Sequence, residues 1–152
     1  MTEPTAEQLR EQLALPPIEQ IGFVVPDIKQ AMVDYEALFG PWITMDVEME
    51  GAQYRGEIHD ASLSLAFGKS GDLEIELIEI TGGNSPHREF IESGRSGMHH
   101  IRFRTPDIDN KIALAKGMGY ELIWYQRMRE DTAFCYLERA GDPLIVEFLQ
   151  MP

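Results

Sequence analysis

Four polar residues in this chain have the donor types of a divalent metal site. The set contains one amide, one imidazole and two carboxylates, from Gln20, His100, Glu76 and Glu147. Three oxygen donors and one imidazole nitrogen suit a fairly hard divalent ion such as Mn, Co, Ni, Mg or Zn. The thiolate-rich pattern of structural zinc sites is absent, because the sequence has a single cysteine, Cys135. The four residues lie far apart along the chain, so a shared site requires a fold that brings them together.

An internal repeat places the four residues at equivalent positions. Aligning Gln20 with His100, an offset of 80 residues, lays QIGFVVPDI over HIRFRTPDI, and five of the nine positions agree. Aligning Glu76 with Glu147, an offset of 71 residues, lays LEIEL over LIVEF. Both halves contain a strand, then a helix, then three or four strands in the same order. The sequence therefore predicts a duplicated β-α-β-β-β unit.

The predicted elements divide the chain into an extension and one repeated domain. Residues 1–17 are expected to be an N-terminal helical extension, whose short amphipathic helix ends before Pro16 and Pro17. Residues 18–150 are expected to be a single domain, with modules at 18–80 and 98–150 and a linker at 81–97. The helix of each module begins after a Pro-Asp pair, and the strand-like runs that follow the helices are 42–49, 53–59, 62–67 and 73–80, then 121–127, 132–138 and 143–149.

Side-chain alternation predicts which residues share a face of each strand. Ile21 and Phe23 are expected to face the helix that follows their strand, which leaves Gln20 on the opposite face. The same reasoning leaves five further residues on this inner face: Glu76, His100, Arg102, Arg104 and Glu147. Buried carboxylates without partners are costly, so the inner face needs solvent, basic residues or a cation. Two equivalent residues from each module could close four ligands around one ion.

A metal ion beside two carboxylates suits proton transfer next to a carbonyl group. The ion binds the carbonyl oxygen and stabilises the charge of the developing enolate, while a carboxylate removes the α-proton. Glu147 and Glu76 are the candidate catalytic bases and are also candidate ligands. A carboxylate can act as a base only if its bond to the metal is weak, and the sequence leaves both roles open. Opposed carboxylates would permit proton delivery to either face, as an epimerase or isomerase requires.

The charge of the chain restricts its partners. The net charge of −13, from 13 Lys and Arg against 26 Asp and Glu, opposes binding to nucleic acid or to anionic lipid. No run approaches the roughly 18 apolar residues of a membrane span, and the acidic, polar N-terminus differs from a signal peptide. A cytoplasmic location and a small-molecule substrate are therefore expected.

A local cluster of arginines hints at the charge of that substrate. The segment 86–104 carries four arginines against two glutamates: Arg88, Arg95, Arg102 and Arg104 against Glu89 and Glu92. Arginine is well suited to bind carboxylate or phosphate, which favours an acyl-CoA or a small oxo acid. The arginines could equally balance nearby acids such as Glu74. Tyr54 and Tyr136 are further candidates to contact substrate, although aromatic residues on strands often serve packing.

The repeat and its motifs resemble the vicinal oxygen chelate superfamily. The resemblance covers about residues 18–150 and includes the Pro-Asp helix starts, the IEL-like closing strands and the linker SPHREFIESGRSGMHHI. It is closest to methylmalonyl-CoA epimerase-like and glyoxalase-like proteins. It implies an α+β fold in which two tandem βαβββ modules form an open, cup-shaped mixed sheet. It also implies one divalent metal ion in the cup and a homodimer.

The resemblance assigns the metal ligands to the first and last strand of each module. Carried over residue by residue, the implied ligands are Gln20, Glu76, His100 and Glu147. His100 matches rather than His99, because it directly precedes the apolar strand residue. The resemblance thus implies a metal-dependent isomerase, epimerase or lyase that transfers a proton next to a carbonyl, on an anionic acyl or oxo substrate.

Two alternatives remain open within the same superfamily. The ligand set resembles that of eukaryotic-type glyoxalase I, a lyase. However, Val24 stands where an arginine that contacts glutathione is expected. The asparagine expected after the second ligand is also missing, and Ile80 is the nearest residue to that position. The second alternative is a non-catalytic sequestration or resistance-type binding protein. Dioxygenase chemistry fits less well, since the extradiol enzymes of the superfamily use two histidines and one glutamate.

Overall fold

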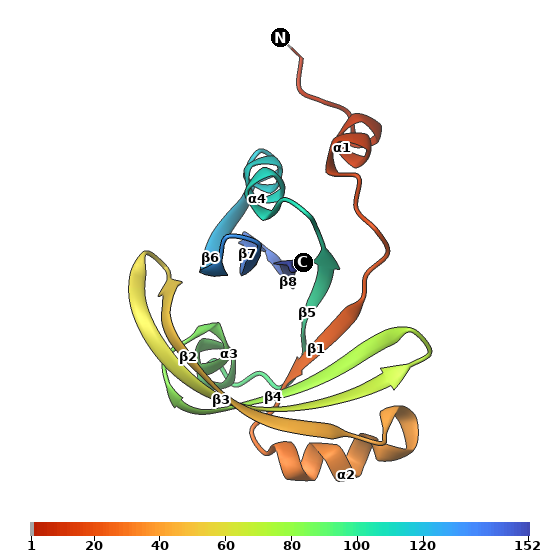
Figure 1. Cartoon of the computed structure of the whole chain (residues 1–152), viewed down its shortest axis with the longest axis vertical. Helices are drawn as coiled ribbons and strands as arrows, with labels where there is room; N and C mark the ends of the chain where they lie inside the picture. The colour runs from red at the N-terminus through yellow and green to blue at the C-terminus, as the bar shows by residue number, and fades with distance from the viewer. Residues whose placement is uncertain (1) are drawn as a thin grey trace.

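The structure is a computed structural model that describes residues 2–152. The first half contains α1 (Ala6–Leu13), β1 (Gln20–Val24), α2 (Ile28–Phe39), β2 (Ile43–Tyr54), β3 (Glu57–Ser70) and β4 (Leu73–Gly83). A short helix, α3 (Pro86–Glu92), follows. The second half contains β5 (Gly97–Arg104), α4 (Ile108–Lys116), β6 (Tyr120–Arg129), β7 (Thr132–Arg139) and β8 (Asp142–Gln150). Figure 1 shows the two halves as two curved layers, with α2 and α4 on their outer sides. The predicted α+β class and the duplicated order of elements are confirmed.

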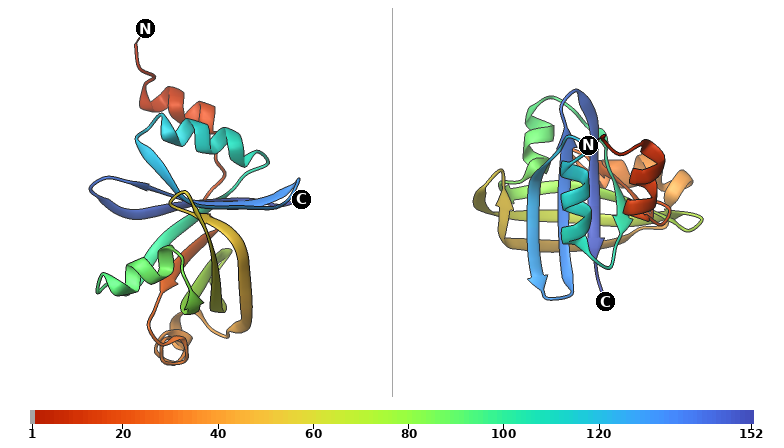
Figure 2. Two further views of the ribbon diagram at one scale, coloured as in Figure 1. Left: turned by 90° about the vertical axis from the view of Figure 1, so that its left-hand side faces the viewer. Right: turned by 90° about the horizontal axis from the view of Figure 1, so that it is seen from above.

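The eight strands form one closed barrel in the order β1-β4-β3-β2-β6-β7-β8-β5. Within each half the first and last strands are parallel neighbours, β1 with β4 and β5 with β8. The halves meet where β1 pairs antiparallel with β5, in the middle of the molecule (Figures 1 and 2). This junction brings the first and last strands of both halves side by side, which is the arrangement that a shared site requires.

The closed barrel corrects the expected open cup. The barrel closes because the end of β2 pairs with β6, at Gln53 with Tyr125 and Tyr54 with Trp124. Sequence periodicity assigns the faces of a strand but not the partner of an edge strand, so this junction had no signal in the sequence. The contact is short compared with the β1–β5 junction, where pairing extends from Gln20 to Val24.

The first module also has fewer strands than its runs suggested. The break expected at Gly51 is an irregularity inside β2, where the register shifts between Met49 and Ala52. The hairpin turn lies instead at Arg55 and Gly56, which both have positive φ, at 49° and 85°. Two consecutive positive φ values match the backbone twist of a tight hairpin. The runs 42–49 and 53–59 therefore belong to β2 and to the start of β3.

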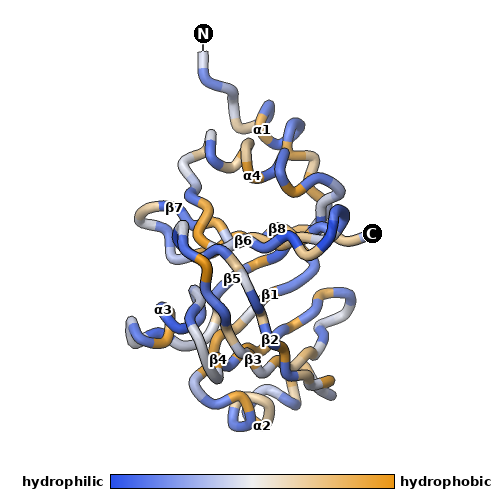
Figure 3. The backbone as a smooth tube through the Cα atoms, turned by 60° about the vertical axis from the view of Figure 1, so that its left-hand side comes forward, coloured by the Kyte–Doolittle hydropathy of each residue, from blue (hydrophilic) through white to orange (hydrophobic). Residues whose placement is uncertain are grey.

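The two module helices pack on the outside of the barrel, as the alternation predicted. Asp27 and Asp107 cap α2 and α4, and their side chains accept hydrogen bonds from the backbone N–H groups of Gln30 and Asn110. Phe23 packs with the cluster beneath α2, and Phe103 packs with the cluster beneath α4. Figure 3 shows hydrophobic stretches along the strands that lie between α2 and α4.

The predicted N-terminal helix is present as α1 and lies beside α4 (Figure 2). Thr5 and Gln8 form a capping box at its start. Leu13 and Leu15 reach the apolar surface beneath α4. The helix α4 is shorter than its counterpart in the first half, with 9 residues against 12 in α2. The N-terminal segment therefore covers surface that the shorter helix leaves exposed. In the described part of the chain, no helix has the length and apolar character needed to cross a membrane.

Candidate metal centre

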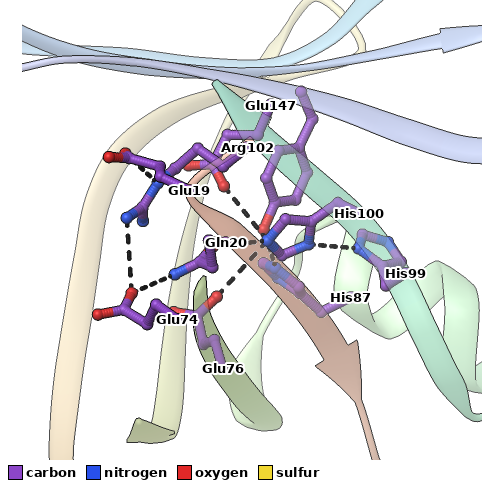
Figure 4. A network of polar contacts seen from close by, with 10 residues as sticks. Glu19, Gln20, Glu74, Glu76, His87, His99, His100, Arg102 and Glu147 are labelled. Atoms are coloured by element: carbon purple, nitrogen blue, oxygen red, sulfur yellow. Dashed lines mark hydrogen bonds and ion pairs between the residues drawn. The ribbon is translucent and has the colours of Figure 1, made fainter. Parts of the chain in front are cut away.

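The structure brings Gln20, Glu76, His100 and Glu147 together at one buried point inside the barrel (Figure 4). The Nε2 atom of His100 lies 3.1 Å from Gln20 Oε1, 3.5 Å from Glu76 Oε1 and 3.2 Å from Glu147 Oε1. Gln20 and His100 are fully buried, and the side chains of Glu76 and Glu147 are each 11% exposed. Each module therefore contributes one residue from its first strand and one from its last.

Strand register explains why these side chains meet. Gly22 on β1 pairs with Glu76 on β4 and with His100 on β5, so the two polar residues flank a position without a side chain. A Cβ atom at position 22 would overlap the imidazole atoms of His100. The His100 ring therefore lies across the backbone of Gly22 and points toward the carboxylates. Glycine is required here for a close approach rather than for backbone flexibility.

A register shift in β5 gives His99 a second role beside His100. The pairing with β1 passes from Gly22–His100 to Phe23–Met98, so His99 is an extra residue in the ladder. Such an irregularity re-aims side chains, and here the Nδ1 atoms of His99 and His100 lie 3.0 Å apart. When His100 presents Nε2 as a ligand, its Nδ1–H donates to His99. A partner of this kind fixes the tautomer of a metal-binding histidine.

A second group of contacts orients Gln20. Its amide Nε2 donates to Glu74 Oε1 at 2.7 Å, which leaves Oε1 directed at His100. The Nη2 of Arg102 lies 3.5 Å from the same Glu74 oxygen, and its Nε donates to Glu19 at 2.9 Å. Burial opposes the charge of Arg102, but Glu147, Glu19 and the other nearby carboxylates outweigh it and raise its pKa. Arg102 therefore stays charged beside the cluster and offsets its excess of carboxylates.

The same carboxylates control the protonation of His100. Burial lowers its pKa, but hydrogen bonds and charge from Glu147 and Glu76 outweigh burial and raise the pKa to about 9. Without a metal ion, His100 is thus an imidazolium at neutral pH and balances part of the carboxylate charge. A divalent ion would have to displace this proton, because only the neutral imidazole is a ligand.

The donor set fits a divalent ion in chemistry and in spacing. Neighbouring ligands of an octahedral ion with bonds of about 2.1 Å lie about 3 Å apart. The separations between His100 Nε2 and the three oxygens, 3.1 to 3.5 Å, are close to this value. Among residues 2–152, no three His, Cys, Asp or Glu side chains are already arranged as a formed metal site. The three oxygens instead lie around the Nε2 atom of His100.

A cavity of about 440 Å³ opens next to the cluster. Its polar lining residues are Glu76, His87, Arg102, Tyr136 and Glu147, and most of the remaining wall is Met, Val, Leu, Ile and aromatic. Of the four residues expected to contact substrate, Arg102 and Tyr136 line this cavity. Tyr54 and Arg104 do not: Tyr54 packs in the interior cluster, and Arg104 donates to Glu19 at 3.1 Å. The cavity therefore combines an apolar wall with a charged floor.

Sequence reasoning missed His87, which lies on α3 in the predicted linker. His87 is fully buried and lines the cavity, with Nε2 2.9 Å from the hydroxyl of Tyr136. Burial lowers its pKa to about 3, so its ring is neutral at ordinary pH. The linker has no counterpart in the repeat, and a lone histidine on a short helix gives no spacing to interpret. The Ser-Pro-His order at the helix start was the available signal, since a serine cap holds that histidine's backbone.

Comparisons with known proteins agree with this architecture. The chain is 29% identical to the uncharacterized protein YqjC of Bacillus subtilis over 106 residues. The aligned region covers 70% of this chain and 69% of YqjC. The fold of this chain is similar to that of the hypothetical protein BH1468 from Bacillus halodurans, with a TM-score of 0.61 and 23% identity. The similarity covers 89% of this chain and 94% of BH1468.

Two further structures with the same fold are epimerases. The methylmalonyl-CoA epimerase of Mycobacterium tuberculosis has a TM-score of 0.61, 17% identity and coverage of 91% of this chain and 90% of its own. A methylmalonyl-CoA epimerase in complex with methylmalonyl-CoA and NH4+ has a TM-score of 0.62, 20% identity and coverage of 91% and 99%. At these identities the likeness concerns the fold. Residues 19–136 match the model of one family, and the chain therefore belongs to the Glyoxalase/Bleomycin resistance protein/Dioxygenase superfamily.

Proposed function

We propose that this protein is a divalent-metal-dependent isomerase, epimerase or lyase that transfers a proton next to a carbonyl group of an anionic acyl or oxo substrate. One observation supports the proposal above all others. Two carboxylates, one imidazole and one amide from both modules meet at the floor of an apolar cavity. This arrangement combines ligands for an ion with groups that can accept a proton.

The residues that would hold the ion are Gln20, Glu76, His100 and Glu147, through their oxygens and the Nε2 nitrogen. A divalent ion bound there supplies a Lewis acid for a substrate carbonyl oxygen. His99 and Glu74 orient two of these ligands, His100 and Gln20, through the hydrogen bonds described above. The chain thus supplies both the ligands and the contacts that keep their donor atoms facing inward.

Glu76 and Glu147 are the proposed bases. Both carboxylates line the cavity, and they approach His100 from the last strands of different modules. A proton removed by one carboxylate could return from the other on the opposite side of the substrate carbon, as an epimerase requires. The positive charge of Arg102, held by Glu19 and Glu74, lies at the cavity wall and suits a carboxylate of the substrate.

The substrate class that we propose is an acyl thioester or a 2-oxo acid with a short apolar group. The apolar wall of the cavity fits such a group, and Arg102 fits a carboxylate. The fold similarity to methylmalonyl-CoA epimerases supports a thioester as the first compound to test. An anionic glyoxalase-type hemithioacetal is the second compound, which separates the lyase from the epimerase.

The deciding experiment follows exchange of the substrate α-proton in deuterated water by NMR. The protein is first freed of metal and then loaded separately with Co, Ni, Mn, Zn or Mg. We expect exchange that depends on the added ion and falls by about 100-fold or more in Glu147→Gln or Glu76→Gln. Glu57→Gln, at an exposed glutamate on β3, is the matched control and should exchange at the wild-type rate. Full exchange activity in both Glu147→Gln and Glu76→Gln would refute the proposed bases.

A non-catalytic binding protein is the second candidate function. The observation that favours it is the apolar cavity wall, which includes four methionines: Met45, Met49, Met128 and Met151. Methionine-rich walls adapt to ligands of different shapes. Tight binding of apolar ligands in the presence of EDTA, with no proton exchange on either substrate class, would favour this function over catalysis.

We also propose that the chain forms a homodimer, in line with the superfamily resemblance. Several large apolar side chains that do not line the cavity are exposed in the single chain, among them Ile43 on β2, Ile58 on β3 and Met98 on β5. Exposed apolar surface of this kind is typical of interaction sites. Light scattering at micromolar protein concentration gives the mass in solution, and a monomer mass would refute the dimer.

A further inference from the structure

A chain of three buried side chains leads from α3 to the wall of the cavity. The Oγ of Ser85 lies 2.8 Å from His87 Nδ1, and His87 Nε2 lies 2.9 Å from the hydroxyl of Tyr136. Ser85 and His87 are fully buried, and Tyr136 is 3% exposed. These groups belong neither to the candidate ligands nor to the candidate bases. Their contacts decide where the hydroxyl hydrogen of Tyr136 can point.

The hydrogen positions follow from counting donors and acceptors. Ser85 caps α3, so its Oγ already accepts the backbone N–H of His87 at 3.3 Å. If His87 carried its hydrogen on Nδ1 and donated it to Ser85, the hydroxyl hydrogen of Ser85 would be buried with no acceptor among the described side-chain contacts. A buried donor without an acceptor costs about 1–3 kcal/mol. The opposite arrangement leaves the hydroxyl hydrogen of Tyr136 without a protein acceptor, but Tyr136 lines the cavity, where water or a ligand can accept it, whereas Ser85 is fully buried. Ser85 therefore donates to Nδ1, and His87 carries its hydrogen on Nε2.

This tautomer makes the Tyr136 hydroxyl the acceptor, rather than the donor, of its hydrogen bond with His87. His87 Nε2–H donates to the oxygen of Tyr136, and the hydroxyl hydrogen of Tyr136 is then free for another acceptor. Within residues 2–152, His87 is the one described hydrogen-bond partner of that hydroxyl. The hydroxyl hydrogen is thus available to a ligand, and the accepted hydrogen bond from His87 strengthens it as a donor.

Strand register places Tyr136 next to the candidate metal centre. Tyr136 on β7 pairs with Glu147 on β8, so both side chains lie on the inner face of the barrel. The Tyr136 ring centroid lies 4.9 Å from that of His100. Both Tyr136 and His87 line the cavity. An oxygen of a bound ligand close to the four candidate ligands would therefore lie on the same wall as the Tyr136 hydroxyl.

We propose that Tyr136, positioned by His87 and Ser85, donates a hydrogen bond to an oxygen atom of the ligand in the cavity. The acceptor is an oxygen with available lone pairs, such as that of a thioester, ketone or carboxylate. The inference rests on the proposed function for the use of this cavity as the ligand site. It needs neither a particular metal ion nor a particular direction of proton transfer.

The first test reads the tautomer of His87 directly. A long-range ¹H–¹⁵N spectrum of the full chain labelled at histidine, recorded at pH 7, distinguishes the protonated from the unprotonated ring nitrogen. His87→Gln assigns the signals by their loss. We expect a protonated Nε2 and an unprotonated Nδ1, with the Nδ1 signal shifted in Ser85→Ala and restored in Ser85→Thr. A protonated Nδ1 in the wild-type protein would overturn the inference.

The second test measures donation to a ligand oxygen. Methylmalonyl-CoA labelled with ¹³C at the thioester carbonyl is titrated into the wild-type protein and Tyr136→Phe. We expect binding to weaken about 3- to 10-fold in Tyr136→Phe, the range for one neutral hydrogen bond, together with a smaller ¹³C shift on binding. Tyr35→Phe, on α2 outside the barrel, is the control and should bind as the wild type does.

The two tests separate this inference from the proposed function. Equal affinity and equal ¹³C shift in the wild type and Tyr136→Phe would overturn the inference even if proton exchange occurs. No binding of methylmalonyl-CoA to the wild type would count against the proposed thioester substrate. In that case the tautomer of His87 would still decide whether the Tyr136 hydrogen is directed away from His87.

Discussion

Gly22 lies directly opposite His100 in the antiparallel pair of β1 and β5, and the His100 imidazole occupies the space that a side chain at position 22 would need. Gly22 also pairs with Glu76 on its other side. The absence of one side chain therefore lets two modules place an imidazole and a carboxylate in contact. The candidate site depends on this glycine as much as on the donors.

Gly22→Ala is expected to weaken metal binding without unfolding the barrel. The added methyl group must push the His100 ring away from Glu76 and Glu147, and displaced ligands typically cost 10- to 100-fold in metal affinity. Calorimetric titration of the metal-free protein with Co²⁺ or Zn²⁺ measures the effect. The control is Gly82→Ala on β4, where a Cβ would meet only ordinary contacts with Ser62. Equal affinity in both variants would show that His100 is not a ligand.

Glu74→Ala is expected to lower metal affinity by about 10-fold, although Glu74 is not a candidate ligand. Glu74 accepts the Gln20 amide hydrogen at 2.7 Å, and without it the amide can rotate and turn its nitrogen inward. Glu74→Gln keeps an oxygen acceptor and should retain more affinity than Glu74→Ala. Titration with the same ion compares the three proteins. The reverse order of the two variants would contradict the proposed role.

Metal binding at pH 7 is expected to release about one proton per chain. His100 has a raised pKa of about 9 in the metal-free protein and must lose its proton to become a ligand. The apparent affinity should therefore rise about tenfold for each pH unit between pH 7 and 8. Titrations in buffers of different ionisation enthalpy count the released protons. Metal binding without proton release would mean either that the ion binds away from His100 or that His100 is already neutral in the metal-free protein.

Stability is expected to fall between pH 6.5 and 5.5. Burial lowers the pKa of His87 to about 3 and that of His99 well below its ordinary value. Below the unfolded value of about 6.5, the unfolded chain binds protons that these folded residues do not, so unfolding becomes easier as pH falls. Each residue contributes a slope of up to about 1.4 kcal/mol per pH unit.

Urea denaturation at several pH values between 5.5 and 6.5 measures this slope. The raised pKa of His100 acts in the opposite direction but at higher pH, since its contribution is present below about 6.5 and is lost toward pH 9. His87→Gln removes one of the two residues and should flatten the slope whatever its effect on total stability. An unchanged slope would show that His87 takes up a proton in the folded state.

Much of the candidate site was predictable because the chain repeats itself. The alignment of Gln20 with His100 fixes two equivalent positions, and alternation along the strands then fixes the face. The equivalence of Glu76 with Glu147 works in the same way. Local patterns suffice for these four residues because the alternation of side chains assigns each of them to the inner face of its strand.

Other features depend on contacts that local patterns do not contain. Closure of the barrel rests on the pairing of Tyr54 with Trp124, two residues from different modules. The extra residue that turns His99 toward His100 is visible only in the register of β5 against β1. His87 lies outside the repeat, so the alignment could not point to it. Each of these features arises from tertiary packing rather than from periodicity.

The unequal lengths of the two junctions between the modules assign separate tasks to separate parts of the chain. The candidate donors flank the longer β1–β5 junction, whereas the methionine-lined wall includes β2 and β6, which touch at the short one. Substitutions along β2 and β6 can reshape the volume offered to a ligand while the donor atoms stay in place. Tolerance for different ligand sizes can therefore change through one set of strands, and the arrangement of the candidate donors through another.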